Sequence, residues 1–449
     1  MIKHWLIGLL SGNQRSILVK KNIIASLVLK GCSVLVSLLL VPLTLGFVSS
    51  DMYGIWLAVS SILLWLSFFD VGFALGLKNR LAEAIAKEDW DRGKCLVSTT
   101  YFMMVIVFVP LCFLGELLIP HIEWIKLLNI SSDYEHEIEN VLQVLLALFC
   151  MQMIASVISS VASAFQQVAL ASLFPVAANF LSLIAITIVS NCLEPSLLIL
   201  ALSLSTMPVL VLIIASMMLY SSTYKRVKPA FSRIRKDYIG ELFSLGYKFF
   251  IIQVQAVVLY QTTNVLIMNV SSPLDVTAYN LAYQYMNVAM MVFTIVLGPL
   301  WPAFTDAYSK GDLVWMQNVV DKMKKFFLIS VVACVLLVLF SGLFYSVWIG
   351  TRVEIPLMLT IFVALYVIVY CWMNLYGTPI VGIGAVKLES RLVVVGMLVH
   401  IPLSLFLGKY FGVYGVISSM IMINLLYAIV FRLQLSKILS GQAKGVWIE

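Results

Sequence analysis

Long apolar stretches recur along the chain from about residue 22 to residue 437, and short polar segments separate them. A helix needs roughly 20 such residues to cross the hydrocarbon core of a bilayer. The pattern predicts twelve membrane-spanning helices, at residues 22–48, 53–77, 95–119, 141–164, 168–190, 196–220, 242–269, 276–303, 326–349, 355–380, 389–408 and 412–435.

The composition supports an all-α integral membrane protein. Of the 449 residues, 62% are hydrophobic and 11% are charged, and the mean hydropathy is +1.02. A soluble domain carries about a quarter charged residues, so this chain could not cover a water-facing surface. The net charge of +7 comes from basic residues scattered through apolar sequence, which form no continuous basic face for nucleic acid.

The basic residues orient the chain. If both termini face the cytoplasm, 24 of the 29 Lys and Arg residues fall on the cytoplasmic side, Lys126, Arg352 and Lys409 fall on the outer side, and Lys30 and Lys248 lie within spans. This asymmetry is what the positive-inside rule requires. We therefore expect both termini in the cytoplasm.

The most basic loop lies between the sixth and seventh predicted spans and divides the chain into halves. Its six cations are Lys225, Arg226, Lys228, Arg233, Arg235 and Lys236. The predicted domains are a cytoplasmic amphipathic lead at 1–20, a six-helix lobe at 21–221, a basic cytoplasmic linker at 222–240, a second six-helix lobe at 241–437, and a cytoplasmic tail at 438–449.

A short internal repeat supports two similar lobes. Ala84-Ile-Ala-Lys-Glu-Asp-Trp90, after the second span, resembles Ala307-Tyr-Ser-Lys-Gly-Asp-Leu313, after the eighth. Because each half has an even number of spans, both halves cross the membrane in the same orientation. They would therefore be parallel repeats around a central cavity. Chance similarity over seven residues is the alternative.

Polar stripes mark the helices that we expect to line this cavity. Residues at helical spacing on one face are Ser26, Ser33 and Ser37 in the first span, Trp56, Ser60, Ser67 and Asp70 in the second, Gln253, Tyr260 and Asn264 in the seventh, and Asn280 and Gln284 in the eighth. Unsatisfied polar groups are costly in hydrocarbon, so such faces avoid lipid. Hydrogen bonding between packed helices is an equally good explanation.

Charged residues within the spans point more directly to a pathway. Lys30, Asp70 and Lys248 each lie roughly 10–12 Å deep, counted at 1.5 Å per residue. Two lysines at matching depths in the two halves suit an anionic, hydroxyl-rich cargo, and Asp70 is a candidate for an ion pair or for a coupling ion. The lysines could instead extend to the interface.

Motifs of catalysis are missing from the sequence. It has no Walker A motif and no HExxH zinc motif, and the predicted outer loops are too short for a catalytic domain. We therefore expect no enzymatic activity, no cofactor and no metal centre.

Two motifs resemble a known family. The run Phe69-Asp-Val-Gly-Phe-Ala-Leu-Gly-Leu-Lys-Asn-Arg-Leu-Ala-Glu-Ala84 follows Tyr53-Gly-Ile-Trp56, and Gly298-Pro-Leu-Trp-Pro-Ala-Phe-Thr-Asp-Ala307 stands at the equivalent place in the second half. They are similar to the O-antigen and capsular-polysaccharide flippases of the multidrug/oligosaccharidyl-lipid/polysaccharide exporter superfamily.

The resemblance implies alternating access by two lobes in a bacterial inner membrane. The implied cargo is undecaprenyl-pyrophosphate-linked oligosaccharide, moved from the inner to the outer leaflet with a proton or sodium gradient as driving force. Lys78 and Arg80 would add positive charge near the inner rim of the cavity. Expected partners are this cargo, membrane lipids and other polysaccharide-assembly membrane proteins, with no nucleic acid.

Two other functions compete with this one. A cation-coupled multidrug exporter of the same superfamily would favour buried carboxylates, of which Asp70 is the clear candidate. A membrane enzyme of the same pathway, such as a polymerase or ligase, would carry a large outer loop, which the sequence lacks.

Overall fold

The structure is a computed structural model that describes residues 14–66, 73–131, 134–240, 242, 262–297 and 300–448. Every regular element within these residues is a helix, and they contain no strand. The described residues form nine helical segments that are long and apolar enough to cross a membrane. The prediction of an all-α membrane protein is confirmed.

The chain divides into two compact units. The first comprises Met1–Ser49, Leu63–Lys126 and Ser131–Val254, and the second comprises Ser50–Ile62, Leu127–Ile130 and Gln255–Glu449. Most of one N-terminal helix, residues 50–62, therefore groups with the C-terminal half of the chain. The domain boundaries inferred from the basic loop stay a prediction.

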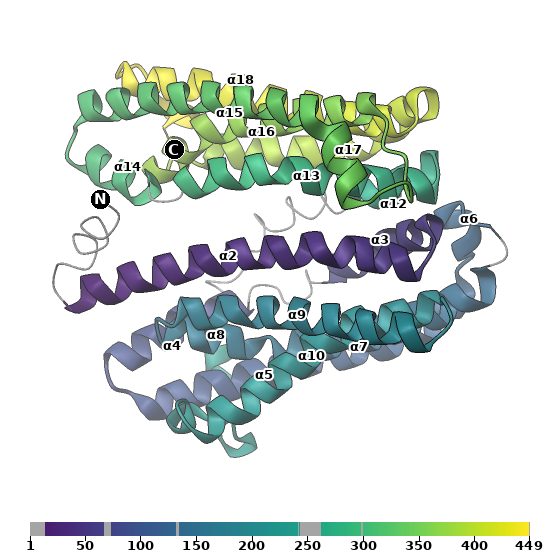
Figure 1. Ribbon diagram of the computed structural model, residues 1–449. Helices are drawn as coiled ribbons and strands as arrows, with labels where there is room; N and C mark the ends of the chain where they lie inside the picture. Colours follow the sequence, from purple (N-terminus) through teal and green to yellow (C-terminus); the bar gives the residue numbers. More distant parts are fainter. Residues whose placement is uncertain are drawn as a thin grey trace, which may run out of the picture. The chain divides into compact units, whose positions relative to one another are not determined.

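The first unit is a helical bundle (Figure 1). Its main helices are α2 (Gln14–Phe47), α4 (Phe73–Ala86), α5 (Trp90–Leu118), α7 (Glu135–Ala155), the short α8 (Val157–Ala164), α9 (Val168–Cys192) and α10 (Leu197–Ser221). Helix α2 packs on α9, α9 on α10, α10 on α7, and α7 on α5, while α4 packs on α5 and α8. Short pieces follow α5 and α10: η2 (Ile119–His121), α6 (Trp124–Leu128), η4 (Lys225–Val227) and η5 (Phe231–Arg233).

The second unit is built around one central helix. Its elements are α3 (Ser50–Trp65), α12 (Thr262–Val270), α13 (Pro273–Leu297), α14 (Leu300–Ser309), α15 (Leu313–Trp348), α16 (Leu357–Ile383), α17 (Lys387–Phe411), α18 (Val413–Leu439) and η7 (Gly445–Trp447). Helix α16 packs against α13, α14, α15 and α18, and α17 packs on α18.

The exposed surface of these helices is apolar. On α15, Leu339, Leu343 and Val347 expose 72%, 67% and 81% of their surface. They recur every four residues, so they form one continuous stripe along the helix. A water-facing helix would place charges there, and such a stripe is typical of a helix that faces lipid.

The internal repeat predicted from the sequence has the same backbone geometry in both copies. Glu88 and Gly311 both adopt positive φ angles, of 56° and 70°. The next residues, Asp89 and Asp312, cap α5 and α15 by accepting hydrogen bonds from the backbone N–H groups of Arg92 and Trp315, both at 3.0 Å. Each half of the chain thus starts a long helix from the same tight turn.

Several predicted spans differ from the observed helices: 141–164 covers the end of α7 and all of α8, and 276–303 contains the end of α13 at Leu297 and the start of α14 at Leu300. The span at 53–77 contains the end of α3 at Trp65 and the start of α4 at Phe73. The span at 326–349 corresponds to α15, which begins much earlier, at Leu313, because Asp312 caps it there. Hydropathy detects only the apolar part of a helix, so it misses the turns that extend beyond the membrane.

Candidate functional site

A chain of polar side chains crosses the second unit. The Nδ2 atom of Asn264 on α12 donates to the Ser61 hydroxyl on α3 at 2.8 Å, and its Oδ1 accepts from Nδ2 of Asn280 on α13 at 2.8 Å. Asn264 is buried. Buried amides need such partners, so this chain fixes three helices against one another.

Helix α3 approaches α13 closely enough for their backbones to touch. A Cβ atom on Gly54 would lie 1.9 Å from the carbonyl oxygen of Pro273. The Thr277 hydroxyl donates to the carbonyl of Ser50 at 2.7 Å across the same junction. Glycine is required at position 54 because any side chain would separate the two helices.

Four tyrosines form a ladder beside the amides. Tyr279 and Tyr283 on α13 have ring centroids 6.0 Å apart, Tyr283 lies 6.2 Å from Tyr366 on α16, and Tyr366 lies 6.1 Å from Tyr370. Such spacing is typical of interacting aromatic pairs. Sequence reasoning did not select Tyr366 and Tyr370 as site residues, although their i, i+4 spacing repeats that of Tyr279 and Tyr283.

Gln284 lies one helical turn after Asn280 and next to Tyr283, half-buried on α13. Within the described residues its side-chain amide has no hydrogen-bond partner. It can therefore both donate to and accept from a polar ligand. Together, the amides and tyrosines form what we call the second-unit polar strip: Asn264, Asn280, Tyr283, Gln284, Tyr366 and Tyr370.

The predicted rim cations lie on α4 in the first unit and have different surroundings. Arg80 donates to Glu83 at 3.2 Å, and Glu83 also accepts from Lys87 at 2.8 Å. The Lys87 ammonium first, and the Arg80 guanidinium next, hold the pKa of Glu83 below its usual value. Lys78 is exposed, and no carboxylate among the described side chains pairs with it. Of the two, Lys78 is the freer to meet an anion.

The remaining predicted site residues are placed only in part. Ser33 and Ser37 are half-buried on α2. The backbones of Ser26 and Lys30 belong to the same helix, but their side chains lie outside the described residues. Asp70, Lys248, Gln253 and Tyr260 also lie outside them. Their predicted roles stay predictions.

Comparison with known proteins gives one family and one fold. Residues 19–308 match the sequence profile of a family described as polysaccharide biosynthesis protein. No curated protein sequence matches the chain significantly.

Similar solved structures include transporters. The chain is similar to an inward-facing multidrug resistance MATE family transporter of the MOP superfamily, with a TM-score of 0.77 and 13% identity over 94% of this chain and 98% of that one. It is also similar to an outward-facing multidrug resistance MATE family transporter of the MOP superfamily, with a TM-score of 0.65 and 13% identity over 97% of this chain and 98% of that one. A crystal structure of MATE in complex with MaD3S matches with a TM-score of 0.61 and 13% identity over 97% of this chain and 98% of that one. At these identities the likeness shows the fold alone.

Proposed function

The chain belongs to the polysaccharide biosynthesis protein family, and we propose that it exports undecaprenyl-pyrophosphate-linked oligosaccharide from the inner to the outer leaflet of a bacterial inner membrane. The family match over residues 19–308 carries this proposal. The fold and the family are those of transporters.

The second-unit polar strip supports a sugar cargo. A sugar offers hydroxyl groups that donate and accept hydrogen bonds, and the Gln284 amide can do both. The half-buried tyrosines Tyr283 and Tyr370 add flat apolar rings with a polar end. This strip carries neutral hydrogen-bonding groups, which suit the hydroxyl groups of a sugar.

In the proposed mechanism, cations hold the pyrophosphate while the prenyl tail stays in lipid. Lys30 and Lys248 supply positive charge within the membrane, and Lys78 supplies it near the inner rim. Rocking of the two lobes then exposes the head group to the other side, driven by a proton or sodium gradient.

A cation-coupled multidrug exporter is the second candidate, because the similar solved structures include multidrug transporters. A cationic drug would be held best by buried carboxylates. The described part of the polar strip contains amides and tyrosines instead, which favours the sugar cargo.

The test is translocation in proteoliposomes. A fluorescent polyprenyl-pyrophosphate oligosaccharide is incorporated in the membrane, and its accessibility at the opposite leaflet is measured with and without an imposed proton or sodium gradient. We expect translocation above that of empty liposomes and faster under one gradient. Efflux of a drug cation without any movement of the oligosaccharide would refute the proposal in favour of the second candidate.

Variants connect the activity with the site. Gln284→Ala should slow translocation, whereas Thr294→Val on the same helix should not, because the Thr294 hydroxyl bonds only to carbonyls of its own helix, at 3.0 and 3.1 Å. Lys30→Ala and Lys248→Ala should slow it at unchanged membrane abundance. Equal rates in all four variants would contradict the assigned binding roles.

A further inference from the structure

The basic linker lies against the first unit as an ordered strap, defined here as residues 225–238. The backbone N–H of Ala230 donates to the Ser98 hydroxyl of α5 at 3.0 Å, and that of Arg235 donates to the Thr99 hydroxyl at 3.1 Å. The Arg226 guanidinium lies 4.9 Å over the Trp90 ring at the start of α5. The strap is therefore held to α5 through its backbone as well as its side chains.

The strap crosses α5 where that helix changes from polar to apolar. The last charged residue before the apolar part is Lys94, and the next one along the helix is Glu116. Residues 98 and 105 are separated by roughly 10 Å along the helix axis. The surface from Ser98 to Val105 thus corresponds to the boundary between the head groups and the acyl chains of the inner leaflet.

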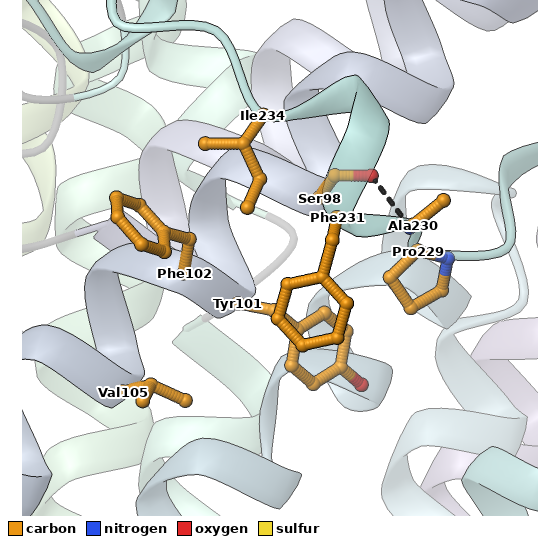
Figure 2. A pocket seen from close by; sticks show the side chains of 8 residues that line it. All are labelled: Ser98, Tyr101, Phe102, Val105, Pro229, Ala230, Phe231 and Ile234. Atoms are coloured by element: carbon orange, nitrogen blue, oxygen red, sulfur yellow. Dashed lines mark hydrogen bonds between the residues drawn. The ribbon is translucent and has the colours of Figure 1, made fainter.

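An apolar pocket of about 340 Å³ lies between α5 and the strap. Figure 2 shows the side chains of Tyr101, Phe102 and Val105 from α5 and of Pro229, Phe231 and Ile234 from the strap around it. Beyond the pocket, the exposed side chains of Val105, Val109 and Phe113 continue as an apolar stripe along α5. A hydrocarbon chain that entered the pocket would lie along this stripe.

Phe231 is 93% exposed in a segment that also carries many cations. A phenylalanine ring is less stable in water than in an apolar environment. Insertion of the ring into an adjacent bilayer would therefore lower its free energy. Aromatic rings near basic side chains are typical of segments that lie in the membrane interface.

Three strap cations are available to an anion. Arg233 pairs with Asp91 at 3.2 Å, but within the described residues no carboxylate pairs with Lys228, Arg235 or Lys236. The one acidic residue of the strap is Asp237. Lys228 and Arg235 are the sequence neighbours of Pro229 and Ile234, which line the apolar pocket, so the strap carries an excess of positive charge next to pocket-lining residues.

We propose that this pocket binds an anionic phospholipid of the inner leaflet. One acyl chain fills the space between α5 and the strap, and the phosphate group lies among Lys228, Arg235 and Lys236. An apolar slot alone would take any lipid, so the unpaired cations supply the preference for an anionic head group. This site is independent of the cargo and lies on the linker between the two predicted lobes.

The experiment uses photoactivatable lipids with a diazirine in the acyl chain. The full-length protein is reconstituted in phosphatidylcholine vesicles that contain either a phosphatidylglycerol probe, a phosphatidylcholine probe with the same chains, or a polyprenyl phosphate probe. Crosslinked peptides are mapped by mass spectrometry. We expect the phosphatidylglycerol probe to label residues 101–105 and 229–234 preferentially, while labelling of the α15 stripe at 339–347 is the same for both phospholipids.

Charge variants test the head-group contact. Arg235→Gln with Lys236→Gln should lower labelling of the pocket by phosphatidylglycerol roughly thirtyfold. The matched control, Lys322→Gln with Lys325→Gln, replaces two exposed lysines of α15. It should leave labelling of the pocket by phosphatidylglycerol unchanged. Phe231→Ser, which removes an exposed ring, should lower labelling of the pocket although Lys228, Arg235 and Lys236 are intact.

Three results would overturn the proposal. Equal labelling of the pocket by the two phospholipid probes would mean that the surface takes any lipid. Preferential labelling by polyprenyl phosphate would assign the pocket to a prenyl chain. No labelling of the pocket, while the α15 stripe is labelled, would mean that the pocket holds no lipid chain.

Discussion

At the scale of single residues, one backbone conformation sets where each half of the chain starts a long helix. Glu88 and Gly311 occupy the same position in two equivalent turns, with φ angles of 56° and 70°. A residue with a Cβ atom pays roughly 1–2 kcal/mol in this region, and glycine does not. The first turn therefore carries strain that the second avoids.

This difference predicts opposite effects of two substitutions. Gly311→Ala should lower the free energy of unfolding by about 1 kcal/mol, because no atom lies within 4 Å of an added Cβ and the backbone strain alone acts. Glu88→Gly should remove that strain, partly offset by the greater entropy of glycine in the unfolded chain and by the lost side chain. The measurement is Tm in detergent, and a rise in Tm for Gly311→Ala would contradict the argument.

The periodicity of the sequence located part of the polar strip and missed the rest for a geometric reason. It selects Asn264 and Asn280, which do hydrogen bond to each other. It places Ser60 rather than Ser61 on the polar face of α3, but the Ser60 hydroxyl donates to Trp56 of its own helix and Ser61 is the residue that meets Asn264. Ser60 and Ser61 lie about 100° apart around the helix, and a helical wheel gives this relative angle but not which face of α3 packs against α12.

At the scale of elements, the position of α3 depends on a backbone contact that hydropathy does not encode. Residues 50–62 group with the second unit although they lie in the N-terminal half of the sequence. Apolar runs predict that a helix exists, but the choice of neighbour depends on small residues that allow close approach. Here that residue is Gly54, which lies against Pro273.

We expect Gly54→Ala to destabilise this junction. The new methyl group would overlap a backbone carbonyl that no rotamer change can move, and overpacking of this kind costs about 1–3 kcal/mol. The control is Gly342→Ala on α15, where no atom lies within 4 Å and the better helix propensity of alanine should raise stability by up to about 1 kcal/mol. Thermal unfolding of both variants in the same detergent tests this, and a neutral Gly54→Ala would show that the two helices can separate without loss.

At the scale of the whole molecule, the membrane explains why the fold class could be predicted from composition. A bilayer leaves few ways to satisfy backbone hydrogen bonds, so long apolar runs become helices. No comparable constraint applies to the linker, whose attachment to α5 includes backbone hydrogen bonds to two hydroxyl groups, Ser98 and Thr99. Its basic composition predicts a cytoplasmic loop but not an ordered strap with a pocket beneath it.

The orientation of the molecule in the membrane can be tested with its own cysteines. Cys192 is exposed at the end of α9, and the positive-inside rule places it on the periplasmic side and Lys225 on the cytoplasmic side. A membrane-impermeant maleimide should therefore label the wild-type chain in intact bacterial cells, and Cys192→Ser should remove most of that label. In the Cys192→Ser background, Lys225→Cys should be labelled only after the inner membrane is permeabilised. Labelling of position 225 in intact cells would show that the predicted topology is inverted. The strap would then not lie at the inner leaflet, because both assignments follow from the same asymmetry of charge.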